Sequence, residues 1–174
     1  MSAGPRFASY DDILALPEHV TGEIIDGELH TQPRPTSRHA RVELGIGRAL
    51  FGSFDLGDGG PGGWVILSEP ELHLGPHVLV PDLAGWRRER LPLIPDGPIE
   101  VASDWVCEIL SPGTARKDRA RKLPLYGRLG VAHAWLVWIR RRRPSRYCDT
   151  PTATGCCWTR SARTIRCERS LSTR

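Results

Sequence analysis

The chain has 174 residues, 40% of them hydrophobic, which suits one domain around a single core. The formal net charge is +4, but residues 138–174 hold ten arginines against two acidic residues, so residues 1–137 carry a net charge of −4. No apolar run approaches the roughly 20 residues of a membrane-spanning helix, and the N-terminus lacks the charged-then-apolar pattern of a signal peptide, so we expect a cytoplasmic protein with no membrane partner.

The first thirty residues predict a short helix followed by a hairpin. The segment Ser9–Asp12 resembles a capping box, which predicts a helix through Leu16. Within residues 21–30, Asp26–Gly27 is a hairpin-type turn signal between short apolar pieces. We therefore expect a strand with a tight turn or bulge at this point.

The next fifty residues predict a helix, a loop and a meander of strands. Apolar spacing over residues 36–51 is compatible with a helix, although two glycines weaken it. The glycine-rich run 56–63 lacks the Gly-Lys-Ser/Thr ending of a phosphate-binding loop, so we interpret it as a flexible connection. Three apolar segments that read as strands follow, at residues 64–67, 71–74 and 77–84.

The last part of the body predicts a strand, a helix and a further strand. The run Trp105–Leu110 is almost entirely apolar and is bounded by turn residues, which is typical of a strand buried on both faces. A helix is expected from Ser111 or Thr114 to about Leu129, and residues 131–137 then return to the sheet. This order of elements predicts an α/β fold in which a mixed sheet is flanked by helices.

Residues 138–174 differ in composition from the body, because they hold four of the five cysteines and no lysine or histidine. The codons of this segment can be re-read in the frame that starts at the third base of each codon. In that frame the codons of Trp138–Ile139 must encode Asp, and those of residues 155–159 must encode an apolar residue, two leucines and Asp. We therefore interpret 138–174 as a disordered, out-of-frame tail that follows a domain of residues 1–137 with truncated last strands. A genuine disordered basic tail is the alternative, and a zinc site is disfavoured because the paired C-x-x-C spacing is missing.

Two carboxylates interrupt apolar strands, where an unpaired buried charge would be strongly unfavourable. Asp82 ends one apolar run and Glu108 lies inside another. On neighbouring strands they would form a hard anionic site for Mg²⁺ or Mn²⁺, ions that promote phosphodiester hydrolysis. Lys122, on the following helix, would add positive charge at the reacting phosphate. Taken alone, Asp82 is typical of a strand end and Lys122 of a solvated helix, so the interpretation depends on the combination.

Several short motifs follow one another in a characteristic order. They are Glu23 to Glu28, Ser37 to His39, Val80-Pro81-Asp82, Glu108 to Pro112 (Glu-x-x-Ser-Pro), Asp118 to Lys122 (Asp-x-x-x-Lys), Tyr126, Gly130-Val131 and Ala134 to Val137. In this arrangement, residues 10–137 resemble the Uma-type restriction endonuclease family of prokaryotes. After Val137 the chain departs from the family pattern.

The resemblance implies a PD-(D/E)XK core and a metal-dependent DNA endonuclease that uses Mg²⁺ or Mn²⁺. Asp82 and Glu108 would be catalytic metal ligands, and Lys122 would be the third catalytic residue. The lysine would have moved to the helix, because Leu110 occupies its usual position in the strand. Lys117 is the other lysine of the body, and helix periodicity does not choose between the two.

Other residues and partners remain as secondary expectations. Glu23 and Glu28 are candidate additional acids at the metal, His39 is either a phosphate contact or a helix-capping residue, and Asp118 would orient the lysine. DNA is the expected partner, with residues 116–122 as the basic patch of the body, and a homodimer is a further expectation. The alternatives are a catalytically silent binding module, a non-functional frame-shifted product, and a nucleic-acid-binding role of the arginine tail.

Overall fold

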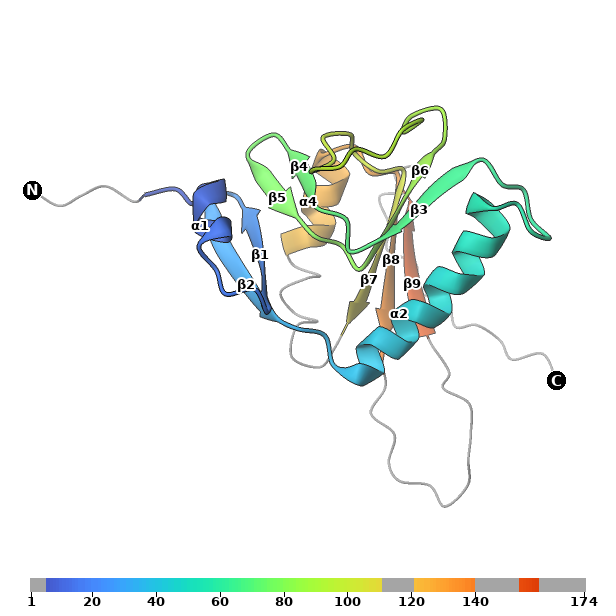
Figure 1. Ribbon diagram of the computed structural model, residues 1–174, viewed down its shortest axis with the longest axis horizontal. Helices are drawn as coiled ribbons and strands as arrows, with labels where there is room; N and C mark the ends of the chain where they lie inside the picture. The colour runs from blue at the N-terminus through green and yellow to red at the C-terminus, as the bar shows by residue number, and fades with distance from the viewer. Residues whose placement is uncertain (1–5, 111–120, 140–153, 160–174) are drawn as a thin grey trace, which may run out of the picture.

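The computed structural model describes residues 6–110, 121–139 and 154–159 of the chain. Its elements, in chain order, are α1 (Tyr10–Leu14), β1 (Val20–Ile25), β2 (Glu28–Pro33), α2 (Ser37–Leu50), η1 (Phe51–Asp55), β3 (Trp64–Ser68), β4 (Leu72–Leu74), β5 (His77–Leu79), β6 (Leu83–Arg87), β7 (Trp105–Leu110), α4 (Leu123–Arg128), β8 (His133–Trp138) and β9 (Thr154–Thr159). The strands form one sheet of four strands and one of five (Figure 1). The predicted α/β fold with a mixed sheet and flanking helices is confirmed.

The four-stranded sheet has the order β2-β1-β5-β4, and all of its pairs are antiparallel. Strands β1 and β2 form the predicted hairpin, with Asp26 and Gly27 between them. These two residues have φ values of 50° and 80°, and the tight hairpin turn that matches strand twist requires positive φ at both positions. The turn therefore fixes the register that pairs Glu23 with His30.

The five-stranded sheet has the order β3-β6-β7-β8-β9 and is mixed. Its one parallel pair is β7 with β8, in register from Trp105↔His133 to Leu110↔Trp138. Parallel neighbours need a long crossover connection, and the segment between these strands contains α4. Every residue of β7 is buried, as its apolar sequence predicted.

The apolar run 77–84, which was expected to be one strand, is divided between the two sheets. Strand β5 ends at Leu79 in the four-stranded sheet, and β6 begins at Leu83 in the five-stranded sheet. Residues 80–82 carry the chain across, and Pro81 lacks the N–H group that a continued ladder would need. The expectation of a single strand is therefore wrong, and Asp82 lies where the chain passes between sheets.

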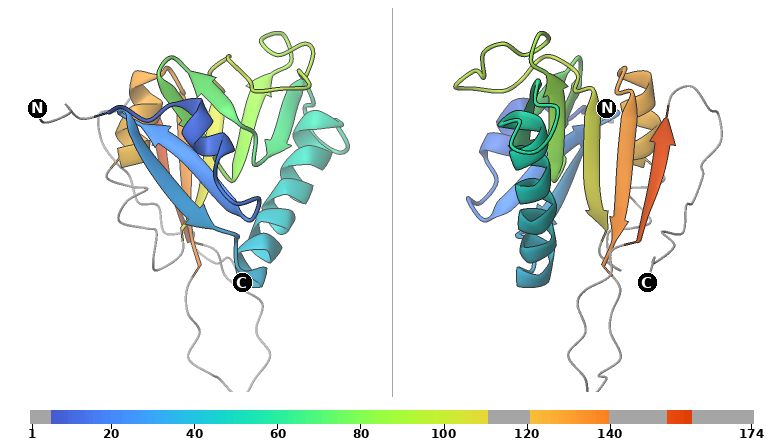
Figure 2. Two further views of the ribbon diagram at one scale, coloured as in Figure 1. Left: turned by 60° about the vertical axis from the view of Figure 1, so that its left-hand side comes forward. Right: turned by 90° about the vertical axis from the view of Figure 1, so that its right-hand side faces the viewer.

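The two faces of the five-stranded sheet are covered by different elements. On one face, α2 packs its residues Val42, Ile46 and Leu50 against Leu83, Trp105, Cys107, Ile109 and Val137. On the other face, the larger core joins sheet residues such as Val106, Leu110 and Leu136 to Leu72 and Leu79 of the four-stranded sheet and to Leu123 and Leu125 of α4. Figure 2 shows α2 and α4 on opposite sides of this sheet.

The helices agree with the sequence where they are described. The capping box of α1 is present, because Asp12 accepts a hydrogen bond from the Ser9 amide at 2.8 Å. Helix α2 begins after Thr36, whose hydroxyl caps the amide of His39. The predicted start of the helix after β7 lies outside the described residues, and none of the described helices is long and apolar enough to cross a membrane.

The segment after residue 138 contributes one described element. Strand β9 pairs antiparallel with β8 and forms an edge of the five-stranded sheet. Residues 140–153 and 160–174 lie outside the described residues. The boundary at residue 137 and the out-of-frame origin of the tail therefore stay predictions.

Candidate active site

Glu108 lies in the middle of β7 and is only 5% exposed. Side chains alternate along a strand, so Glu108 faces the same side as Val106 and Leu110, the side that α4 covers. The Nζ atom of Lys122 lies 2.8 Å from Oε1 of Glu108, and the Tyr126 hydroxyl donates to the same oxygen at 2.6 Å. The buried carboxylate is therefore both charge-paired and hydrogen-bonded.

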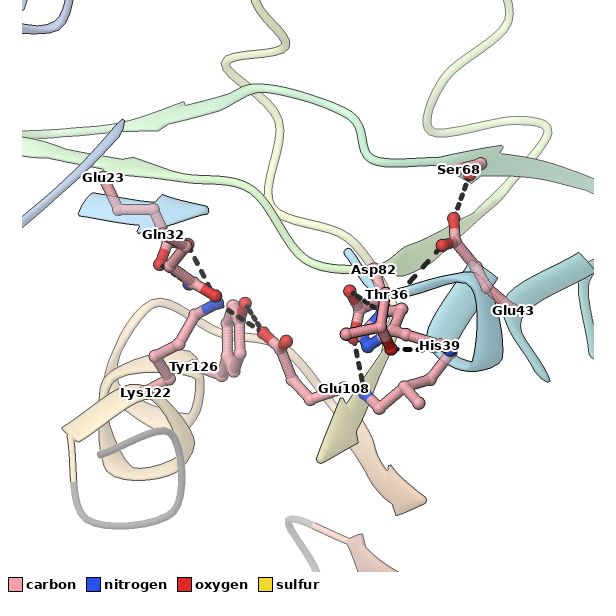
Figure 3. Close-up of polar contacts among 11 residues, drawn as sticks. Glu23, Gln32, Thr36, His39, Glu43, Ser68, Asp82, Glu108, Lys122 and Tyr126 are labelled. Carbon is pink, nitrogen blue, oxygen red and sulfur yellow. Dashed lines mark hydrogen bonds and ion pairs between the residues drawn. The ribbon is translucent and has the colours of Figure 1, made fainter. Parts of the chain in front are cut away.

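Lys122 immediately precedes α4 and is 3% exposed. Its Nζ atom also lies 2.8 Å from Oε1 of Glu23, a residue of β1 that is 1% exposed. Glu23 in turn accepts hydrogen bonds from the Gln32 side chain at 2.9 Å and from the Val80 amide at 2.8 Å. Figure 3 shows this buried cluster, which joins the four-stranded sheet, β7 and α4 around one ammonium group.

The pKa values of the cluster reflect burial and charge together. Burial raises the pKa of Glu108, the charge of Lys122 opposes this shift, and the charges of Asp82 and Glu23 add to it. Burial alone would lower the pKa of Lys122, but the neighbouring acidic groups, Glu108 first, outweigh burial and hold that pKa well above its usual value. Burial and the charge of Glu108 also raise the pKa of Tyr126. Lys122 is therefore a cation at neutral pH and Tyr126 a hydroxyl donor.

Asp82 lies beside β7 and belongs to a second polar group. Its Oδ2 atom accepts a short hydrogen bond from the amide of Ile109, the residue after Glu108. Its Oδ1 atom lies 2.8 Å from Nε2 of His39, in the first turn of α2. Glu43 follows one turn later, with Oε2 4.0 Å from the same nitrogen. Ligand atoms of His39, Glu43 and Asp82 all lie within 4.8 Å of one another.

The chemistry of this second group fits a divalent cation. Carboxylate oxygens suit Mg²⁺ and Mn²⁺, and an imidazole nitrogen suits transition metals. The hydrogen bond with Asp82 raises the pKa of His39 against the opposing effect of burial. Burial raises the pKa of Glu43, whose carboxylate accepts a hydrogen bond from the Ser68 hydroxyl.

The structure brings most of the predicted site residues into two adjoining groups (Figure 3). Glu108 and Lys122 lie in the buried cluster, and Glu23 joins them there. Asp82 and His39 lie in the second group. The amide of the residue after Glu108 connects the groups through its hydrogen bond to Asp82.

Two of the predicted residues are not part of this arrangement. The side chain of Glu28 is 65% exposed and pairs with Arg121 at 2.7 Å, and that hydrogen bond lowers the pKa of Glu28. Asp118 lies outside the described residues, as does the competing Lys117. Arg121, which belongs to the predicted basic patch and to the described residues, is therefore ion-paired with an acidic residue.

Sequence reasoning missed two residues of the site. Glu43 lies four residues after His39, a spacing that puts both side chains on one face of a helix, so helix periodicity could have found it. Gln32 lies two residues beyond His30, the direct partner of Glu23 in the hairpin, and its side chain reaches Glu23 diagonally across the two strands. That contact depends on strand register, which a sequence pattern of this length does not determine.

Comparison with known proteins gives the family. The model of the Uma2 family, described as "Putative restriction endonuclease", matches residues 8–160. The chain belongs to the Uma2 family. The predicted resemblance is thereby confirmed, and a search of curated proteins finds no match. The Uma2 match continues past residue 137 and includes β9.

A solved structure has a similar fold. It is the crystal structure of a "putative nuclease belonging to DUF820" from Anabaena variabilis ATCC 29413. The two structures have a TM-score of 0.68 and 21% sequence identity, over 92% of this chain and 85% of that one. At this identity the likeness establishes a nuclease-like fold, and family membership supports a nuclease role for this Uma2 chain.

Proposed function

We propose that this Uma2 chain is a metal-dependent DNA endonuclease of the PD-(D/E)XK type, which hydrolyses phosphodiester bonds. The observation that carries the proposal is the contact between the buried ammonium of Lys122 and the buried carboxylate of Glu108, next to Asp82. A buried ion pair is costly to form, and a hydrophobic pair of similar volume is often at least as stable. The presence of this ion pair beside a second acid, Asp82, therefore favours a catalytic role.

The ion would be Mg²⁺ or Mn²⁺. Asp82 and Glu108 would hold it, as the sequence predicted. His39 and Glu43, whose ligand atoms lie within 4.8 Å of that of Asp82, would be additional donors. Three carboxylates and one imidazole are a donor set that fits either cation, and the imidazole favours Mn²⁺. When bound, such an ion supplies activation of a water molecule and neutralisation of charge on the phosphate.

The side chains of the chain itself have distinct tasks in this proposal. Lys122 keeps its positive charge because Glu108 and Glu23 surround it, and it would stabilise negative charge that develops on the phosphate. Tyr126 and Lys122 both bind Oε1 of Glu108 and so fix that carboxylate. The amide of Ile109 fixes Asp82 in the same way, so that little reorganisation is needed at the reacting centre.

A second observation supports DNA as the substrate. Arg38, Arg41 and Arg48 are exposed on α2, the helix that presents His39 and Glu43 to Asp82. Within the described part of the chain, none of the three arginines has an ion-pair partner. Unpaired arginines next to the site are suited to DNA phosphates, in a domain whose overall charge is negative.

The test is cleavage of supercoiled plasmid DNA by the full chain in the presence of Mg²⁺ or Mn²⁺, with an Asp82→Ala variant as control. We expect nicked or linear product that disappears with chelator and with the variant. Cleavage that persists after either change would reject the site. Binding of DNA without any cleavage would instead favour the catalytically silent binding module.

A further inference from the structure

Glu23 is a buried acid that the proposed metal site does not include. We infer that Glu23 is a positioning residue, which holds the Lys122 ammonium and the chain segment of Asp82 in one arrangement and does not bind the metal. This inference rests on the proposed function and assigns a role to a residue that sequence alone had suggested as a metal ligand.

The first step of the argument is the position of Glu23 at the crossing between the sheets. Its Oε1 atom accepts a hydrogen bond from the Val80 amide at 2.8 Å. Val80 follows β5 directly and begins the three-residue segment that ends at Asp82. At the other end of this segment, Asp82 accepts the amide of Ile109 in β7. The crossing is therefore anchored to β1 at its start and to β7 at its end.

The second step is the contact with the lysine. The same Oε1 atom of Glu23 lies 2.8 Å from Nζ of Lys122, which lies 2.8 Å from Glu108 on its other side. A lysine side chain has four rotatable bonds, so one carboxylate would leave its ammonium free to move around that partner. The second carboxylate holds the ammonium between β1 and β7. Glu23 thus links the position of Lys122 to that of the Asp82 segment through one oxygen atom.

The third step is that both carboxylate oxygens of Glu23 are already engaged by donors of the protein. Oε1 serves the Val80 amide and Lys122, and Oε2 accepts the amide group of Gln32 at 2.9 Å. Glu23 is only 1% exposed, so its carboxylate is closed off from solvent as well. Figure 3 shows Glu23 and Lys122 in one group and Asp82 in the other, with Glu108 between them.

The test compares Glu23→Gln with Glu71→Gln in the full chain. Glu71 is a matched control, because it is a partly buried acid of the same region whose carboxylate binds Tyr10 at 2.8 Å and His73 at 2.8 Å. Glutamine retains the size of glutamate and an acceptor oxygen for the Val80 amide, but removes the charge that holds Lys122. We expect Glu23→Gln to lower kcat for plasmid cleavage about 10- to 100-fold. KM and the Mn²⁺ affinity should stay within twofold of the wild type, and Glu71→Gln should change none of these values.

A second readout does not depend on cleavage. The metal-free proteins are treated with an amine-acylating reagent, and the modification of Lys122 is measured by mass spectrometry at a temperature where both variants are folded. We expect Lys122 to react at least tenfold faster in Glu23→Gln than in the wild type or in Glu71→Gln, because the ammonium has lost one of its two anionic partners.

The outcomes separate this inference from the proposed function. A loss of Mn²⁺ affinity of tenfold or more in Glu23→Gln would make Glu23 a metal ligand and overturn the inference. Unchanged kcat or unchanged Lys122 reactivity would overturn it as well. If the wild type cleaves no DNA under any condition, the proposed function fails, and the acylation rate still decides whether Glu23 holds the lysine.

Discussion

At the scale of single residues, the site depends on charges that are buried and satisfied by one another. Lys122 is the only cation in contact with Glu23 and Glu108 among the described residues, and all three are nearly inaccessible to water. Each charge is therefore tolerated because of the others. The removal of one partner leaves the rest uncompensated in a medium of low dielectric constant.

The substitution Lys122→Met tests this dependence through stability. It leaves two buried carboxylates without a cation, so we expect the free energy of unfolding at neutral pH to fall by about 3–5 kcal/mol. Arg121→Met is the control, because Arg121 pairs with the exposed Glu28 in a solvent-screened contact whose loss should cost far less. Urea denaturation followed by circular dichroism measures both values, and equal losses would contradict the account.

His39 gives a pH-dependent prediction for the metal-free protein. Its hydrogen bond with Asp82 raises its pKa above the usual 6.5, so the protonated form is favoured in the folded state. The stabilisation is therefore complete below the pKa of the unfolded chain and is lost as the pH rises through the higher folded pKa. We expect the NMR titration of His39 to have its midpoint above 6.5, and Asp82→Asn to lower that midpoint. An unchanged midpoint in Asp82→Asn would show that the pair does not hold the proton.

At the scale of elements, α2 carries the site residues His39 and Glu43, an apolar face and a set of exposed arginines. His39 and Glu43 lie one turn apart and face Asp82, while Val42 and Ile46 pack on the sheet. The arginines of the helix are exposed. The helix therefore contributes ligand atoms to the site and positive charge to the surface around it.

The combined substitution of Arg41 and Arg48 by glutamine tests the surface role of α2. We expect weaker binding of double-stranded DNA, with a salt dependence whose log–log slope is smaller by about 0.9 for each phosphate that the variant no longer neutralises. The kcat for cleavage at saturating DNA should stay within twofold, because neither residue contacts the site. Arg128→Gln is the control, since Arg128 pairs with Asp26 at 3.3 Å. Fluorescence anisotropy at several salt concentrations measures the slopes, and a slope unchanged from the wild type would exclude α2 as a phosphate-binding element.

The sequence predicted local features of the elements better than their pairing. The turn at Asp26–Gly27, the capping box at Ser9–Asp12 and the buried strand Trp105–Leu110 depend on nearby residues, and the structure has all three. The division of residues 77–84 between two sheets depends on partners far along the chain, so an apolar run looked like one strand. Glu43 belongs to the site only through His39, one helical turn earlier, and Asp82, which is distant in the chain, so its own place in the sequence does not mark it.

At the scale of the whole molecule, the composition of the chain changes at the C-terminal edge of the five-stranded sheet. Strand β8 pairs with β7 on one side and β9 on the other. The Uma2 match continues to residue 160, while the composition changes at residue 138. The catalytic candidates all precede that change, so a shifted reading frame would affect the stability of the fold before it affected the chemistry.

A frame-corrected chain tests this prediction. We expect translation in the shifted frame from residue 138 to raise the midpoint of thermal unfolding, because leucines replace the cysteine-rich segment at the sheet edge. Resequencing through the codons of Val137 and Trp138 is the direct check. An intact frame in several independent clones, or a lower midpoint for the corrected chain, would contradict the hypothesis.

The most direct test of the proposed site is the rate of Mg²⁺-dependent plasmid nicking by Lys122→Ala compared with Arg121→Ala. The two residues are neighbours in the chain, but one is buried against Glu108 and the other is paired with Glu28 at the surface. At a temperature where circular dichroism finds both variants folded, we expect Lys122→Ala to lose about 10²- to 10³-fold in rate. Arg121→Ala should stay within twofold of the wild type. Equal rates for the two variants would contradict the assignment of Lys122 to the active site.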